Sequence, residues 1–134
     1  IGLSNVTKFL KNSGLKASVI GKSLPRTNAS DIALFYEKLY KGELGNKGST
    51  AAMMELLQKQ QLNDRIPKYL PEGTVVGHKT GELGYVKHDA GIVFTEKGDY
   101  IIVILSDSKN PAAAAERQAL LSKAVYEYFD SQEN

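Results

Sequence analysis

The residues of this chain with the most specific chemistry are Lys79, Thr80 and Gly81, which directly follow a strand-like run at residues 74–77. A lysine ammonium and a threonine hydroxyl side by side on a strand can hold a carboxylate through charge-assisted hydrogen bonds. A glycine at the next position lets a ligand lie close to the backbone. The tripeptide therefore predicts a carboxylate-binding edge.

Two other interpretations of this segment are open. Lys79 and Thr80 also suit an ordinary strand end in solvent, because such tripeptides arise by chance. A phosphate-binding loop is disfavoured, since His78 separates Gly77 from the lysine and the segment leads into more strand instead of a helix.

The only two histidines, His78 and His88, are candidate general bases near neutral pH. With Asp89 beside His88 they could also outline a metal site, but no third ligand stands at a suitable spacing. Local hydrogen bonding in the sheet is the simpler interpretation. We expect neither a metal nor an organic cofactor.

A serine nucleophile can be activated by a lysine one helical turn later. Two pairs have that spacing, Ser13 with Lys16 and Ser106 with Lys109. Gly14 breaks the first pair and the second follows a strand, so neither has the helical turn that the chemistry needs. The composition makes about one such match expected by chance.

Composition narrows the class of protein. The chain has 134 residues, enough for one modest domain, with no cysteine and a net charge of +2. Disulfides, thiol catalysis and cysteine-bound metals are therefore excluded. Its lysines are scattered instead of clustered, so we expect no nucleic-acid partner.

Capping residues and helical spacing predict four helices, which begin at Ser4 or Asn5, Asn28, Ser49 and Asn110. The apolar face predicted for the last helix comprises Leu121, Ala124, Val125 and Tyr128, with Phe129 beside it.

Three strands are predicted at residues 74–80, 89–95 and 100–106, and a turn at residues 96–99 joins the last two. Residues 100–105 are apolar without alternation, which is typical of a strand buried on both faces. Three strands make a small sheet around so apolar a segment. We therefore expect the chain to be part of a larger α/β unit.

The order of these elements resembles the C-terminal half of the class A β-lactamase-like, penicillin-recognising serine hydrolases. The resemblance covers essentially the whole chain. Residues 1–14 resemble the helix after the family's Ser-Asp-Asn loop, and residues 27–44 resemble the helix after the omega loop. Residues 70–83 resemble the approach to the Lys-Thr-Gly strand, and residues 90–93 and 101–106 resemble the last two strands.

The fold that this resemblance implies is of the α/β (α+β) type, with the antiparallel strands of a β-lactamase/transpeptidase-like sheet packed on a helical domain. Residues 1–71 would be part of the helical domain with a shortened omega-loop region. Residues 72–134 would be the C-terminal part of the α/β domain, with three strands and the terminal helix. The fold would be incomplete in this chain.

The resemblance also implies roles for single residues. Lys79, Thr80 and Gly81 would bind the substrate, with Lys79 and Thr80 holding its carboxylate and assisting the acylating serine. The backbone N–H of Glu82 would be one of two oxyanion-hole donors. The serine and the Ser-Asp-Asn loop would precede Ile1, so this chain alone is expected to be inactive.

The implied partners are a β-lactam or a peptidoglycan stem peptide, and the N-terminal half of the same protein. The complete protein would be extracellular or anchored in the cell envelope, with its targeting segment outside this chain.

The function that the resemblance implies for the complete protein is hydrolysis of β-lactams through an acyl-enzyme, and two alternatives to it stay open. The family's β-lactamases use an omega-loop glutamate to activate the deacylating water, and residues 15–28 contain no acid. Slow deacylation would make the protein a penicillin-binding, D,D-peptidase-like protein. A non-catalytic binding domain that keeps the carboxylate edge is the other alternative.

Overall fold

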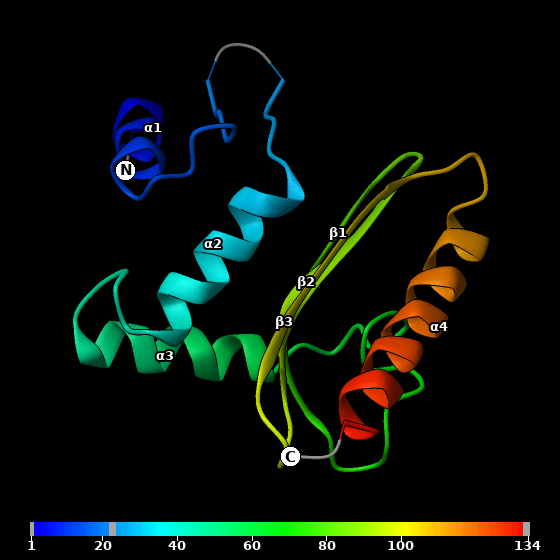
Figure 1. Ribbon diagram of the computed structural model, residues 1–134. Coiled ribbons are helices and arrows are strands. Elements are labelled where there is room, and N and C mark those ends of the chain that lie inside the picture. Colours follow the sequence, from blue (N-terminus) through cyan, green and yellow to red (C-terminus); the bar gives the residue numbers. More distant parts are fainter. Residues whose placement is uncertain (1, 22–23, 133–134) are drawn as a thin grey trace.

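A computed structural model describes residues 2–21 and 24–132, in which helices cover both faces of a three-stranded antiparallel sheet (Figure 1). The strands are β1 (Val75–Leu83), β2 (Val86–Phe94) and β3 (Tyr100–Asp107), in the spatial order β1-β2-β3. The helices are α1 (Leu3–Asn12), α2 (Ala29–Tyr40), α3 (Lys47–Gln58) and α4 (Pro111–Asp130). Figure 1 shows α2 and α3 on one side of the sheet and α4 on the other. The antiparallel α/β prediction is confirmed.

Two of the predicted helix starts are confirmed. The Asn28 side chain accepts a hydrogen bond from the Asp31 N–H (2.8 Å) at the start of α2. The Asn110 side chain accepts one from the Ala113 N–H (3.0 Å) at the start of α4, where Pro111 occupies the first turn. Each bond satisfies an N–H that has no partner within its helix.

The other two helix starts were predicted wrongly. Helix α1 begins after Gly2, without a side-chain cap, and not at Ser4 or Asn5. Helix α3 begins after Asn46, whose side chain accepts from the Ser49 N–H at 2.9 Å. Asn46 has the extended backbone of a cap, so Ser49 lies in the first turn as a donor.

The strand carrying the Lys-Thr-Gly tripeptide is longer than predicted. Gly81 remains in β1, where it pairs with His88, and the chain reverses at Gly84, which has a φ of 57°. A glycine adopts this left-handed conformation without the steric cost of a Cβ. Strand β2 consequently begins at Val86, three residues before the predicted start. The second hairpin turn, at residues 96–99, is confirmed.

The core lies on both faces of the sheet. The cluster facing α4 contains Ile66, Val76, Val93 and Ile102, and the cluster facing α2 and α3 contains Tyr36, Ala90 and Ile92. Strand β3 contributes to both, through Ile102 and Ile104 on one face and Ile101 and Val103 on the other. The prediction that residues 100–105 pack on both faces is thus confirmed.

The predicted buried face of α4 is largely wrong, since Val125 packs against the core but most of the other predicted residues are exposed. The residues buried there are Ala114, Ala115, Gln118, Ala119 and Ser122. Leu121 is 51% exposed and Tyr128 is 61% exposed. The small residues let α4 approach the sheet, and two polar side chains bind it there: Gln118 donates to the Lys87 carbonyl (2.9 Å) and Ser122 to the Ile66 carbonyl (2.9 Å). Among the residues 2–21 and 24–132, no helix has the length and apolar character to cross a membrane.

Candidate carboxylate-binding site

Strand alternation sends the side chains of the candidate site to opposite faces of the sheet. A Cβ placed on Gly77 would lie 3.5 Å from side-chain atoms of α3, so Gly77 and Lys79 face the α2–α3 side. His78, Thr80 and Glu82 face the α4 side. The tripeptide therefore presents its ammonium and its hydroxyl on either side of one strand.

This strand is also at the edge of the sheet. Within the described chain β1 pairs only with β2, so its other edge is free. A free edge offers backbone N–H and C=O groups to an extended ligand. The edge, the ammonium and the hydroxyl lie within three consecutive residues.

A cavity of about 360 Å³ lies between α2 and the sheet at this edge. Its lining includes Phe35, Tyr36, Lys79, Thr80, Gly81 and His88. Most of the lining is apolar, with a few polar groups on the sheet side. A concave apolar site with a few convergent polar groups is typical of ligand pockets.

The polar groups of Lys79 and Thr80 are available to a ligand. The Lys79 ammonium donates to the Thr80 carbonyl (2.5 Å) and has further N–H groups to give. Within the part of the chain that the structure describes, the Thr80 hydroxyl makes no hydrogen bond. The exposed Lys79 ammonium can therefore bind a carboxylate without first breaking a side-chain contact, and the hydroxyl of the buried Thr80 has no competing partner there.

Tyr36 ties this edge to α2. Its hydroxyl donates to the carbonyl of Ala90 (2.7 Å), the residue that pairs with Lys79 across the sheet. Burial is the main cause that raises the pKa of Tyr36 above its ordinary value, with the charge of Asp89 second. Tyr36 thus stays protonated and keeps donating over the physiological pH range.

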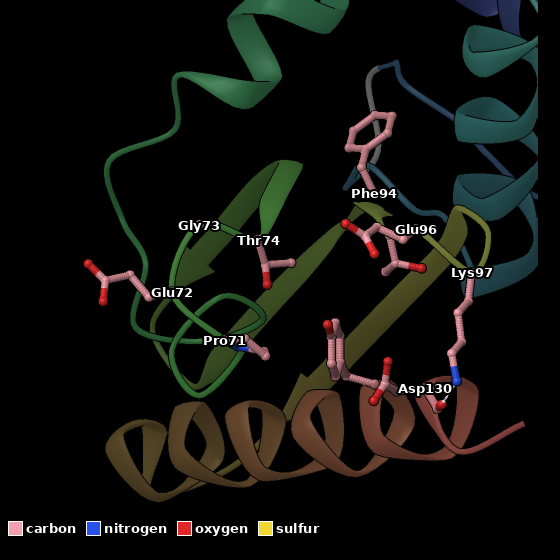
Figure 2. Close-up of a pocket in the computed structure, with 10 residues that line it drawn as sticks. Pro71, Glu72, Gly73, Thr74, Phe94, Glu96, Lys97 and Asp130 are labelled. Carbon is pink, nitrogen blue, oxygen red and sulfur yellow. Dashed lines mark hydrogen bonds between the residues drawn. The ribbon is translucent and has the colours of Figure 1, made fainter.

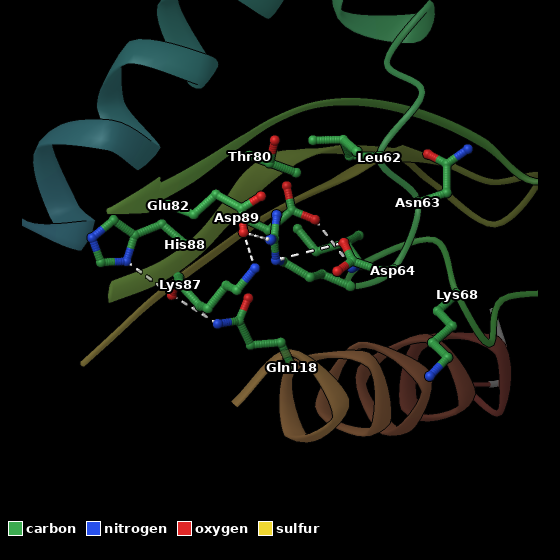
Figure 3. A network of polar contacts seen from close by, with 12 residues as sticks. Leu62, Asn63, Asp64, Lys68, Thr80, Glu82, Lys87, His88, Asp89 and Gln118 are labelled. Carbon is green, nitrogen blue, oxygen red and sulfur yellow. Dashed lines mark hydrogen bonds and ion pairs between the residues drawn. The ribbon is translucent and has the colours of Figure 1, made fainter. Parts of the chain in front are cut away.

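Glu82 is held by two cations on the α4 side. Arg65 donates from Nη2 to the Glu82 carboxylate at 2.8 Å, and Lys87 forms an ion pair with the same oxygen. Figure 3 shows Glu82, Lys87 and Thr80 together on this face. The side chain of Glu82 is thus engaged, while the role of its backbone N–H as an oxyanion donor stays a prediction.

Sequence reasoning did not identify Arg65 as a site residue. It is fully buried, and 17 positions separate it from Glu82. Arginine makes up few of the 17 basic residues of the chain, and this rarity is the one feature of the sequence that could have drawn attention to Arg65. A contact between the loop before β1 and the end of β1 depends on the tertiary fold.

The two histidines have different surroundings. His78 is buried, with Nδ1 2.8 Å from Asp89 and Nε2 3.2 Å from the Asn63 side-chain amide. His88 has Nδ1 3.1 Å from the Ser106 N–H. Both make local hydrogen bonds, as the simpler interpretation predicted. No group of three His, Cys, Asp or Glu residues suited to a metal ion occurs within the described ranges.

Neither candidate serine has a lysine one helical turn away. Ser13 is the residue that ends α1, and Ser106 lies at the end of β3. The Ser106 hydroxyl donates to the Lys87 carbonyl at 2.6 Å. Neither serine therefore lies with its lysine on a helical turn, as the sequence predicts.

The loop between α1 and α2 is organised by Asp31. One oxygen of this buried carboxylate accepts from the Ala17 N–H (2.9 Å), the Ser18 N–H (2.8 Å) and the Ser18 hydroxyl (2.8 Å). The Ser18 hydroxyl is also 2.8 Å from that of Thr27, which lines the cavity. Asp31 thus acts as an anchor for a loop that has no acid of its own.

A second cavity, of about 290 Å³, lies at the other end of the sheet (Figure 2). It is lined by the loop before β1, the turn between β2 and β3, and the end of α4, where Lys97 donates to the Asp130 carbonyl. None of the predicted site residues lines it. The carboxylate-binding edge is therefore the better candidate site.

Comparison with known proteins identifies the family. Residues 1–129 match the sequence profile of the beta-lactamase enzyme family (Beta-lactamase2). The chain belongs to this family. The predicted resemblance to the C-terminal half of a class A β-lactamase-like protein is confirmed.

Known members of the beta-lactamase family cover nearly all of this chain. Beta-lactamase FAR-1 of Nocardia farcinica is 29% identical over 92% of the chain and 44% of its own length. A beta-lactamase from Sphaerobacter thermophilus superposes with a TM-score of 0.89 at 24% identity, covering 100% of the chain and 56% of its own. PBP-A superposes with a TM-score of 0.87 at 26% identity, and the match covers 98% of this chain and 52% of PBP-A. The chain spans about half the length of these relatives.

Proposed function

We propose that the complete protein is an exported serine acyl-transfer hydrolase that acts on β-lactams, and that this chain supplies the carboxylate-binding half of its active site. The observation that carries the proposal is the edge of β1 that is free within the described residues, where the Lys79 ammonium has N–H groups to spare beside a cavity and the Thr80 hydroxyl follows on the next residue. Membership of the beta-lactamase family supports it.

In this proposal the Lys79 ammonium and the Thr80 hydroxyl hold the carboxylate of the substrate. Gly81 lets the ligand lie along the strand. A serine upstream of this chain attacks the lactam carbonyl, and the Glu82 backbone N–H stabilises the oxyanion that forms. The carbonyl–nitrogen bond then breaks and leaves an acyl-enzyme, which water hydrolyses.

The remainder of the active site would come from the N-terminal half of the same protein. Two surfaces of this chain are suited to contact with that N-terminal half. Strand β3 has one free edge within the described residues. Helix α4 carries exposed large apolar side chains at Leu120, Leu121, Tyr128 and Phe129. An added strand and an apolar helix would cover them. This chain alone would then bind weakly and turn over nothing.

The second candidate function is penicillin binding with slow deacylation. Residues 15–28 lack an acid, and the neighbouring carboxylate of Asp31 is engaged by three donors on one oxygen. These contacts tie the Asp31 carboxylate to the loop. The likeness to PBP-A supports this candidate; an L158E mutant of PBP-A forms an acyl-enzyme complex with penicillin G.

Nitrocefin hydrolysis by the full-length protein, followed together with its intact mass, separates these functions. Sustained turnover supports the hydrolase and contradicts the second candidate. A burst that stops at one equivalent, with a stable mass adduct, supports penicillin binding. Absence of both turnover and adduct contradicts both functions and favours a non-catalytic binding domain.

A further inference from the structure

Arg65 has an unusual set of contacts for a buried cation. Its side chain is 1% exposed, and only Nη2 has a hydrogen-bond partner among the described residues. The donors Nε and Nη1 are buried without an acceptor, and the nearest other carboxylate, that of Asp64, lies 3.6 Å from Nε. Unpaired buried donors are rare in proteins and each one calls for an explanation.

The guanidinium lies beside the predicted carboxylate-binding residues. The N–H of Ile66, the next residue, donates to Asp89, which pairs with Thr80 across the sheet. Arg65 itself reaches Glu82, two residues beyond Thr80 on the same face. The cation therefore lies on the face of β1 that carries the Thr80 side chain, and Figure 3 shows the acids and Thr80 gathered there.

The Glu82 carboxylate that Arg65 binds has room to move to another partner. The Glu82 side chain is 42% exposed, whereas that of Arg65 is enclosed. Lys87, opposite Glu82 in the sheet, is a second cation for the same carboxylate. If Glu82 turned from Arg65 to Lys87 alone, its charge would stay paired and the guanidinium would face the edge of β1.

We propose that Glu82 is an internal competitor at the carboxylate site: its side chain occupies the Arg65 guanidinium in the free protein, and the carboxylate of a ligand takes its place. This inference deepens the proposed function and rests on it for the identity of the ligand. A bound carboxylate would engage Thr80 and the Nη2 of Arg65 that Glu82 releases, while Lys87 retains Glu82. Glu82 would thereby set the affinity of the site for anionic ligands.

The test uses the full-length protein and acetate as the simplest carboxylate. Binding is followed by the nitrogen-15 resonance of the Arg65 Nε–H, assigned by its loss in Arg65→Lys. We expect Glu82→Gln and Glu82→Ala to bind acetate about fivefold or more tightly than the unmodified protein, the factor that corresponds to roughly 1 kcal/mol. Glu116→Gln is the matched control, since it removes an exposed ion pair with Lys68 and should change nothing.

Equal or weaker acetate binding by both Glu82 variants would overturn the inference, whatever happens with β-lactams. Acylation by benzylpenicillin, measured on the same proteins, tests the proposed function separately. If acetate binding tightens in the variants and no form is acylated, the competitor role stands and the proposed function fails. Tighter acetate binding together with faster acylation supports both.

Discussion

His78 Nδ1 lies 2.8 Å from the Asp89 carboxylate, on the face of the sheet opposite Lys79. The pair joins β1 to β2 from behind the candidate site, and Asp89 also accepts from the Ile66 N–H (3.1 Å). Both side chains are buried. The contact therefore fixes the loop before β1 and the strand that carries Lys79 without using any group that a ligand needs.

Asp89→Ala is expected to destabilise the protein strongly. Removal of the carboxylate leaves His78 Nδ1 and the Ile66 N–H buried without that partner, which costs about 3 kcal/mol. Urea unfolding measures the change in the free energy of unfolding. Glu127→Ala, which removes an exposed contact with Lys123, serves as the control and should leave that free energy unchanged. A similar midpoint for both variants would contradict the structural role of the pair.

Lys79→Ala in the full-length protein is expected to slow acylation by penicillins about 10- to 100-fold, since a hydrogen bond to a charged group contributes about 1.5–3 kcal/mol. Stopped-flow measurement of the acylation rate constant gives the effect. Lys59→Ala is the control, because Lys59 pairs only with the exposed Glu55 on α3. An unchanged rate in Lys79→Ala would refute its assignment to the substrate carboxylate.

Gly91→Ala is expected to disrupt the sheet. A Cβ at this position would lie 2.5 Å from both the Gly77 carbonyl oxygen and the His78 Cβ, and the backbone atoms cannot move aside cheaply. Overpacking of this kind costs about 1–3 kcal/mol. Thermal unfolding should show a large loss of stability, whereas Gly45→Ala, with its nearest neighbour at 3.7 Å, should be tolerated. Equal melting temperatures would show that this close approach relaxes easily.

Tyr100→Phe is expected to change the dependence of stability on pH. Burial raises the pKa of Tyr100 from 10.0 to about 12, and its hydroxyl has no partner among the described residues. Between these pH values the folded chain keeps a proton that the unfolded chain loses, so stability falls as pH rises. The variant should keep its stability near neutral pH and lose less between about pH 10 and 12. An unchanged slope in urea unfolding would contradict the assignment.

Local features of the fold could be predicted from the sequence because neighbouring residues decide them. Asn28 and Asn110 cap their helices through N–H groups three residues away. The turn at residues 96–99 likewise depends on its own residues. Ser49 was misassigned because Asn46, a competing cap three residues earlier, also fits the pattern.

The face of α4 could not be predicted in the same way. Periodicity places Leu121 and Tyr128 together, but alanines and two hydrogen-bonding side chains, Gln118 and Ser122, occupy the buried side. Which face of a helix is buried depends on the surface that it meets. That surface is formed by β2, β3 and the loop at Ile66.

The sequence by itself determined that Lys79 and Thr80 stand on a strand with Gly81 directly after them, because the three are consecutive and the strand pattern is local. The tertiary structure alone decided what surrounds them. Strand alternation placed Lys79 over the cavity, and the packing of the loop before β1 brought Arg65 to Glu82 across 17 positions. Contacts between distant residues form only when the whole chain is packed, and this one places a buried cation on the strand that carries the tripeptide.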